Sequence, residues 1–137
     1  MGLIHLDAGV IIGFLDANDA HHQASRAALA DALQHGDRVA FAASALAECL
    51  VGPARRGEQA VNSVRDLVDR LPISIVALDV EIATVAAKLR AAHRAVRLPD
   101  ALVIATAIHE AADRLITTDR KWPTARALRY KGVITRL

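Results

Sequence analysis

Short apolar runs alternate along this chain with longer segments in which apolar residues recur at helical spacing. The runs are nearly continuous in apolar residues, which is typical of strands buried on both faces of a parallel sheet. The runs predict strands at Leu3–Leu6, Arg38–Ala42, Ile73–Leu78, Arg114–Thr118 and Gly132–Thr135. The segments between them predict helices at Ala8–Leu15, His21–His35, Ser44 to Gly52, Glu58–Leu71, Val80–Ala95 and Ala101–Ala112. This alternation predicts an α/β fold, a three-layer α/β/α domain with a mostly parallel four- to five-stranded sheet.

Three local signals refine this outline. Ser44 is a favourable N-cap residue, so we expect it to begin the third helix. The pair Gly52-Pro53 is expected to break that helix, because proline lacks the amide hydrogen that a helix interior needs. The stretch from Trp122 to Leu128 is expected to form a short helix or turn before the last strand.

Composition limits the range of architectures and partners. The 137 residues, 53% of them hydrophobic, are enough for one domain spanning residues 1–137, with no internal repeat and no low-complexity linker. The net charge of +2 and the isoelectric point of about 9.1 are compatible with nucleic acid but are weak evidence for it. A single cysteine, Cys49, excludes an internal disulfide and a zinc site built from several cysteines. No signal peptide or spanning segment is visible, so a cytoplasmic location is expected.

Four acidic residues stand out by their positions. Asp7 and Asp119 follow predicted strands, Glu48 lies early in the helix after the second strand, and Asp100 opens a strongly apolar helix. In a parallel sheet with right-handed crossovers these positions share one edge, so the four carboxylates are expected to meet in one cleft. Their mutual repulsion would be relieved by a hard divalent cation such as Mg²⁺, which prefers oxygen ligands. The chemistry that follows is hydrolysis of a phosphodiester by metal-activated water.

Four motifs of the sequence resemble those of a known family. The motifs are Leu6-Asp7 with Val10–Ile12, Ser44–Glu48, Leu98–Ala107 and Ile116–Asp119, and they resemble the PIN domain, more narrowly the VapC-type toxins. The resemblance implies an endoribonuclease dependent on Mg²⁺ or Mn²⁺, the toxin of a bacterial type II toxin–antitoxin pair. It implies that Asp7, Glu48, Asp100 and Asp119 are the metal-binding, catalytic acids. It also implies a homodimer and a cognate antitoxin whose C-terminal segment occupies the cleft.

Two departures from the family pattern concern the metal site. Many relatives carry a hydroxyl residue after the first acid, where this chain has Ala8-Gly9, so Thr117 or Thr118 is expected to supply that hydroxyl. Relatives often place a further Asp or Asn shortly after the fourth acid, whereas Arg120 and Lys121 stand here. The number of metal ions, one or two, therefore stays open.

Further residues are predicted around the cleft. Arg97, Arg120, Lys121 and Thr118 are expected to contact RNA phosphates. Asp16 is the other acid that could fold back toward the cleft. Two further side chains are expected to be structural: His5 as a packed, hydrogen-bonded core histidine, and Trp122 as packing over the sheet edge, with base stacking as its alternative.

The proposed chemistry assigns a role to each acid. Asp7, Asp100 and Asp119 would hold Mg²⁺, and Glu48 would orient or deprotonate the attacking water. Cleavage of single-stranded or looped RNA would leave 5′-phosphate and 3′-hydroxyl ends. An antitoxin would need an exposed apolar groove, expected between the Glu48 helix and the Glu58–Leu71 helix.

Two other functional classes fit these residues less well. A dehalogenase-like phosphatase using Asp7 as nucleophile needs a second acid two residues later, where Gly9 stands. A receiver-like module would use Asp79 but lacks the acidic pair after the first strand. A catalytically silent PIN-fold module that binds RNA or protein remains the alternative.

Overall fold

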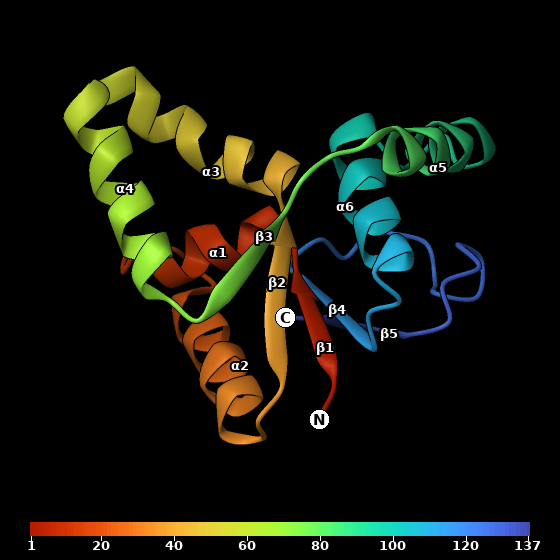
Figure 1. Ribbon diagram of the computed structural model, residues 1–137, viewed down its shortest axis with the longest axis horizontal. Helices are drawn as coiled ribbons and strands as arrows, with labels where there is room; N and C mark the ends of the chain where they lie inside the picture. The colour runs from red at the N-terminus through yellow and green to blue at the C-terminus, as the bar shows by residue number, and fades with distance from the viewer.

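Five parallel strands form one sheet at the centre of the molecule (Figure 1). The computed structural model describes all residues from Met1 to Leu137. The strands are β1 (Leu3–Leu6), β2 (Arg38–Ala42), β3 (Ile73–Val76), β4 (Arg114–Thr117) and β5 (Val133–Arg136). Their order across the sheet is β3-β2-β1-β4-β5, and every neighbouring pair is parallel. The predicted α/β architecture with a parallel sheet is therefore confirmed.

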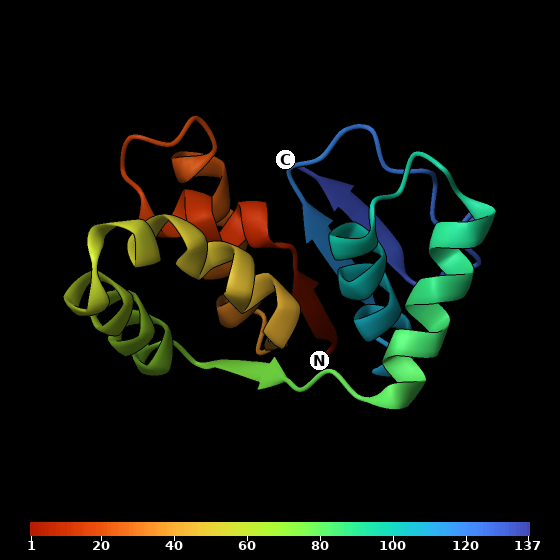
Figure 2. The same cartoon turned by 90° about the horizontal axis from the view of Figure 1, so that it is seen from above.

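Six helices cover the sheet. They are α1 (Ala8–Leu15), α2 (His22–Gln34), α3 (Ala43–Arg56), α4 (Glu58–Arg70), α5 (Val80–Ala92) and α6 (Leu98–His109). Figure 2 shows α1 to α4 grouped on one side of the sheet and the α5–α6 pair on the other. No helix is both long and apolar enough to cross a membrane.

The core lies on both faces of the central strands. Phe41 and Leu115 are fully buried on the sheet, and Leu6 is nearly so. Helix α6 is buried along most of its length because its residues are small and apolar on every side. Close packing of this helix against α5 and the sheet fixes the position of its first turn, which carries Asp100.

The third strand is shorter than the sequence predicted. It ends at Val76, although apolar residues continue to Leu78. The reason is register: Val76 pairs with Ala42, which is the last residue of β2, so later residues have no partner strand. Leu78 and Val80 are left exposed.

Two expectations about α3 were wrong. The helix begins at Ala43 with Ala42 as its N-cap, and Ser44 lies inside its first turn without capping it. The helix also continues through Pro53 to Arg56. Pro53 is buried, so its packing offsets the lost amide hydrogen bond, and the helix ends instead at Gly57, whose φ of 119° favours glycine.

Other boundaries differ by a few residues. Helix α5 ends three residues earlier than predicted, at Ala92, and α6 spans Leu98–His109 rather than Ala101–Ala112. Pro99 fits this earlier start, since proline is well accommodated in the first turn. The stretch 122–128 contains turns rather than a helix.

Candidate active site

The four predicted acids lie at the carboxyl edge of the sheet. Asp7 directly follows β1. Asp119 follows the neighbouring strand β4, and Thr118 lies between Asp119 and the end of that strand. Glu48 lies in the second turn of α3, and Asp100 is the third residue of α6. The charge of Asp7 interacts with those of Glu48 and Asp100.

Asp7 is a buried carboxylate with two defined hydrogen bonds. It is 6% exposed and forms the N-cap of α1, where its Oδ1 accepts a 2.8 Å hydrogen bond from the Ala8 amide. Its Oδ2 accepts a 2.7 Å hydrogen bond from the Thr117 hydroxyl. Burial raises the pKa of Asp7 to about 6, the two hydrogen bonds oppose this rise, and the charges of Asp100 and Glu48 add to it. The site therefore holds a carboxylate whose ionised form calls for a cation.

Thr117 connects two of the acids. Its side chain is fully buried, and its Oγ1 accepts a 3.0 Å hydrogen bond from the Asp119 amide while donating to Asp7. The Asp119 Oδ1 in turn accepts from the Lys121 amide at 2.8 Å. One buried hydroxyl thus fixes the Asp7 carboxylate relative to the backbone of Asp119.

The pKa values of Asp100 and Glu48 are raised, as that of Asp7 is. Burial raises the pKa of Asp100, Arg97 opposes this rise, and the negative charge of Asp119 adds to it. Burial also raises the pKa of Glu48, the charge of Asp100 adds to the rise, and Arg97 again lowers it. The Arg97 Nε lies 3.7 Å from the Asp100 Oδ2, but the Arg97 side chain is 79% exposed, so this ion pair contributes little. The mutual repulsion of the acids is left largely uncompensated.

Trp122 and Arg136 contribute to the site, and sequence reasoning missed both contributions. The Trp122 indole is buried in the core, as expected for packing, which leaves it unavailable for base stacking. Its Nε1–H forms no hydrogen bond of ordinary geometry, yet it lies near enough to the Asp100 carboxylate to lower that group's pKa. The Arg136 guanidinium donates to the carbonyls of Trp122 and Pro123 at 3.0 and 2.9 Å, so β5 holds this loop in place. No local sequence signal marks Arg136, because the contact depends on pairing between β4 and β5.

The residues predicted to contact RNA differ in exposure. Arg97, Arg120 and Lys121 are exposed, and each is within three residues of Asp100 or Asp119. Thr118 is half-buried next to Asp119. Three cationic side chains therefore lie at the border of the acidic group, and Arg97 among them forms a weak, exposed ion pair with Asp100.

The chemistry of the donor set fits a hard divalent cation, although the side chains do not form a preassembled cage. No three carboxylate, imidazole or thiol side chains lie close enough together to hold a metal ion as they stand. The acids instead interact through their charges, and the pKa of the buried Asp7 is raised in part by Asp100 and Glu48. Mg²⁺ in proteins usually binds one or two carboxylates and keeps several waters, so pairs of acids suit it better than a closed cage would.

A groove beside Glu48 opens toward α1 and α4. It has a volume of about 470 Å³, and its apolar wall includes Ile12, Leu15 and Val64. Asp16 and Glu48 both line it, so Asp16 lies beside the same groove as one predicted acid. A groove therefore lies between α3 and α4 where one was expected, with α1 forming a further wall, but charged side chains line it alongside the apolar ones.

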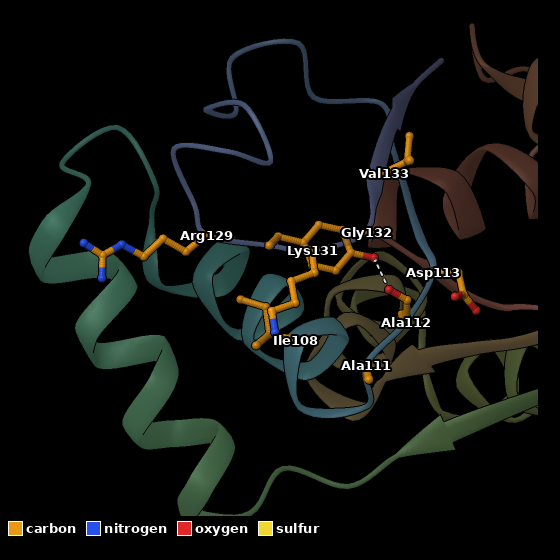
Figure 3. A pocket seen from close by; sticks show the side chains of 9 residues that line it. Ile108, Ala111, Ala112, Asp113, Arg129, Lys131, Gly132 and Val133 are labelled. Carbon is orange, nitrogen blue, oxygen red and sulfur yellow. Dashed lines mark hydrogen bonds between the residues drawn. The ribbon is translucent and has the colours of Figure 1, made fainter.

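A second pocket lies at the opposite edge of the sheet. Figure 3 shows its lining, which includes Asp113 before β4 and Val133 at the start of β5. The Tyr130 hydroxyl donates a 2.7 Å hydrogen bond to the Ala112 carbonyl across this pocket. None of the four predicted acids lines it, so it is separate from the acidic site.

His5 is buried as predicted, but its Nε2 does not form the predicted hydrogen bond. It is 1% exposed, as predicted for a core histidine, but its Nε2 has no hydrogen-bond partner. Burial lowers the pKa of His5 to about 4, so the ring is neutral at neutral pH.

Comparison with known proteins identifies the family. The family model for the PIN domain matches residues 4–128, which is most of the chain. The chain belongs to the PIN domain family. A search of curated protein sequences gave no match.

Solved structures with the same fold include VapC toxins of VapBC toxin–antitoxin systems. VapBC2 from Rickettsia felis, crystallised with a promoter DNA fragment, has 16% identity, a TM-score of 0.70, and 98% coverage of both chains. VapBC-1 from nontypeable Haemophilus influenzae has 17% identity and a TM-score of 0.68, covering 98% of this chain and 97% of its own. VapC20 from Mycobacterium tuberculosis, described as a sarcin-ricin loop cleaving toxin, has 16% identity and a TM-score of 0.66, with 82% and 86% coverage. At these identities the likeness establishes that this PIN domain shares their fold.

Proposed function

We propose that this PIN domain is a divalent-metal-dependent endoribonuclease and the toxin of a type II toxin–antitoxin pair. The observation that carries the proposal is the buried Asp7 carboxylate, whose pKa is raised to about 6 while Glu48 and Asp100 add their charges to the same site. An acidic group of this kind, unmatched by buried cations, is suited to Mg²⁺ or Mn²⁺. PIN domains are typically nucleases, which agrees with this chemistry.

Asp7, Asp100 and Asp119 would hold the metal, directly or through water. Thr117 orients the Asp7 carboxylate from one side and the Ala8 amide orients it from the other. When bound, the ion would neutralise the acids, stabilise negative charge on the phosphate and make a water molecule more acidic.

Glu48 would act on the attacking water. Its half-buried carboxylate has a raised pKa, which makes it a better proton acceptor than an ordinary glutamate. The water oxygen forms a bond to phosphorus and gives a proton to a Glu48 Oε. The bond from phosphorus to the 3′-oxygen breaks, and that oxygen takes a proton from solvent. The products carry 5′-phosphate and 3′-hydroxyl ends.

Arg97, Arg120 and Lys121 would bind RNA phosphates flanking the cleaved bond. All three are exposed at the border of the acidic group. Arg97 also weakens the repulsion around Asp100 and Glu48. Such contacts position the strand without reading its sequence.

The partner would be an antitoxin that covers the groove beside Glu48. This groove combines the apolar side chains of Ile12, Leu15 and Val64 with the charge of Arg56. An amphipathic segment of the partner could bury its apolar side chains there and reach Glu48. Structural relatives have been crystallised as toxin–antitoxin complexes. A homodimer is part of the same proposal.

The test is cleavage of total RNA by the purified, partner-free protein. We expect cutting with Mg²⁺ or Mn²⁺, none with EDTA, and none from the Asp7→Ala or Asp100→Ala variant. Asp69→Asn, which removes an exposed acid on α4, is the matched control and is expected to cut normally. End-group analysis should find 5′-phosphates, and cyclic phosphate ends would contradict the proposed attack by water.

The alternative is a catalytically silent PIN domain that binds RNA or protein. One observation favours it: the acids do not form a preassembled set of three metal ligands. In that case the folded protein would cut no RNA with any metal, and the Asp7→Ala variant would bind its partner as the wild type does.

A further inference from the structure

Gly9 lies against the hydroxyl of Thr118. Gly9 is the second residue of α1, and a Cβ atom added to it would lie 2.2 Å from the Thr118 Oγ1. The other nearest atoms, Cβ and Cγ2 of Thr118, would lie at 3.4 and 3.6 Å, which is ordinary contact. In its present rotamer the Thr118 hydroxyl therefore occupies the space that a Cβ atom at position 9 would take.

The backbone gives no other reason for glycine at this position. Gly9 is not among the glycines with positive φ, which are Gly36 and Gly57. A glycine within a helix costs about 0.5–1 kcal/mol relative to alanine. The unfavourable residue at position 9 is therefore explained by the space that the Thr118 hydroxyl takes.

The Thr118 hydroxyl faces Gly9, two residues after Asp7, and forms no side-chain hydrogen bond within the protein. The hydroxyl of the neighbouring Thr117, by contrast, forms two hydrogen bonds: it donates to Asp7 and accepts from the Asp119 amide. No side-chain hydrogen bond within the protein involves Thr118, which is half-buried and directly precedes Asp119. A hydroxyl without a protein partner, on the residue before Asp119 and against the first turn of the helix that Asp7 caps, is available to a bound molecule.

We propose that the Thr118 hydroxyl donates a hydrogen bond to a phosphate oxygen of the RNA, and that position 9 is glycine so that this hydroxyl keeps its place. This inference rests on the proposed ribonuclease function. A neutral donor suits a site of this kind, because it attracts the phosphate without neutralising the carboxylates that hold the metal. Thr118 is in this account a substrate-binding residue, and Gly9 acts through it.

The first test compares two substitutions of Thr118. Binding of a short, labelled single-stranded RNA of mixed sequence is measured by fluorescence anisotropy in an Asp100→Asn background, which prevents cleavage. Thr118→Val keeps the shape of the side chain and removes the hydroxyl, so we expect about tenfold weaker binding. Thr118→Ser keeps the hydroxyl and is expected to bind as the unsubstituted background does.

The second test fills the space at position 9. Gly9→Ala is expected to turn the Thr118 hydroxyl away and to weaken RNA binding as much as Thr118→Val does, with little change in Tm because a short side chain can rotate. Gly52→Ala is the matched control. Gly52 is also helical, but a Cβ atom added to it would lie 4.0 Å from its nearest neighbour, Arg56 Nη1. In a Thr118→Ala background, Gly9→Ala is expected to cause no further loss.

The outcomes separate this inference from the proposed function. Equal RNA affinity in Thr118→Val and its background, or in Gly9→Ala and Gly52→Ala, would overturn the inference even if the wild type cuts RNA. A wild type that never cuts RNA, but whose RNA binding depends on Thr118 as described, would contradict the ribonuclease and support the phosphate contact. A protein that binds no RNA would overturn both.

Discussion

The hydroxyl of Thr117 donates a 2.7 Å hydrogen bond to the carboxylate of Asp7, which is 110 residues away in the sequence. Both side chains are buried, and their strands are neighbours in the sheet. The register of β1 against β4 brings them together, since Leu6 pairs with Ile116. The orientation of the first acid of the site is thus set by the sheet itself.

Removing this hydroxyl should impair cleavage. Thr117→Val retains the side-chain shape but leaves the Asp7 Oδ2 without its donor, and partners of this kind change activity or metal affinity by about 10- to 100-fold. We expect kcat/KM on RNA to fall within that range. Thr117→Ser, which retains the donor, should keep most of the activity, and equal activity in the valine and serine variants would contradict this role.

The stability of the metal-free protein should fall as pH rises through the range in which Asp7 ionises. The folded protein binds this proton more tightly than the unfolded chain, because the pKa of Asp7 is raised from 3.8 to about 6. Stability from this group is therefore greatest below pH 3.8 and declines as pH rises to about 6, by about 3 kcal/mol at most. Asp7→Asn should flatten this part of the pH profile of chemical denaturation.

Two comparisons check that the effect arises from this carboxylate. Asp69→Asn, at an exposed position of α4, should leave the profile unchanged. Excess Mg²⁺ should stabilise the wild type at pH 7 and should have much less effect on Asp7→Asn. A wild-type profile with the same slope as the Asp7→Asn profile would show that Asp7 ionises without penalty.

Trp122 should matter through its indole N–H as well as through packing. Trp122→Phe keeps most of the buried ring but removes the donor that faces Asp100. We expect divalent metal affinity, measured by isothermal titration calorimetry, to fall by about tenfold. Leu128→Ala is a control for loosened packing, because Leu128 is also buried; it should lower Tm with less effect on metal affinity.

The basic residues near the cleft should give RNA binding part of its salt dependence. For single strands, each phosphate contact contributes about 0.7 to the slope of log affinity against log salt. Arg97→Ala and Lys121→Ala should each reduce that slope by about this amount. Arg114→Ala removes an exposed charge at the opposite end of β4 and should leave the slope unchanged.

Local sequence patterns were sufficient to predict the order of strands and helices along the chain. They were also sufficient to predict that the four acids lie near the carboxyl edge of the sheet. These features depend on apolar periodicity and on the shared direction of parallel strands, both of which are visible in the sequence. Local rules failed where tertiary packing decides: α3 passes through Pro53 because that residue is buried, and β3 stops at Val76 because β2 ends beside it.

The support around the acids could not be predicted for a related reason. The hydrogen bond from Thr117 to Asp7, the exclusion of a side chain at Gly9 by Thr118, and the contact of Arg136 with Trp122 all join distant segments. Each depends on strand register or loop path to within one residue. The composition of the chain and the spacing of its residues do not reveal such contacts.

The most direct test of the acidic centre is Mn²⁺ binding followed by electron paramagnetic resonance at pH 7. We predict that the wild type and Asp69→Asn bind Mn²⁺ with equal affinity, and that Asp7→Asn and Asp100→Asn each weaken binding by at least about tenfold. The same Mn²⁺ affinity in all four proteins would contradict the claim that these carboxylates form a metal centre.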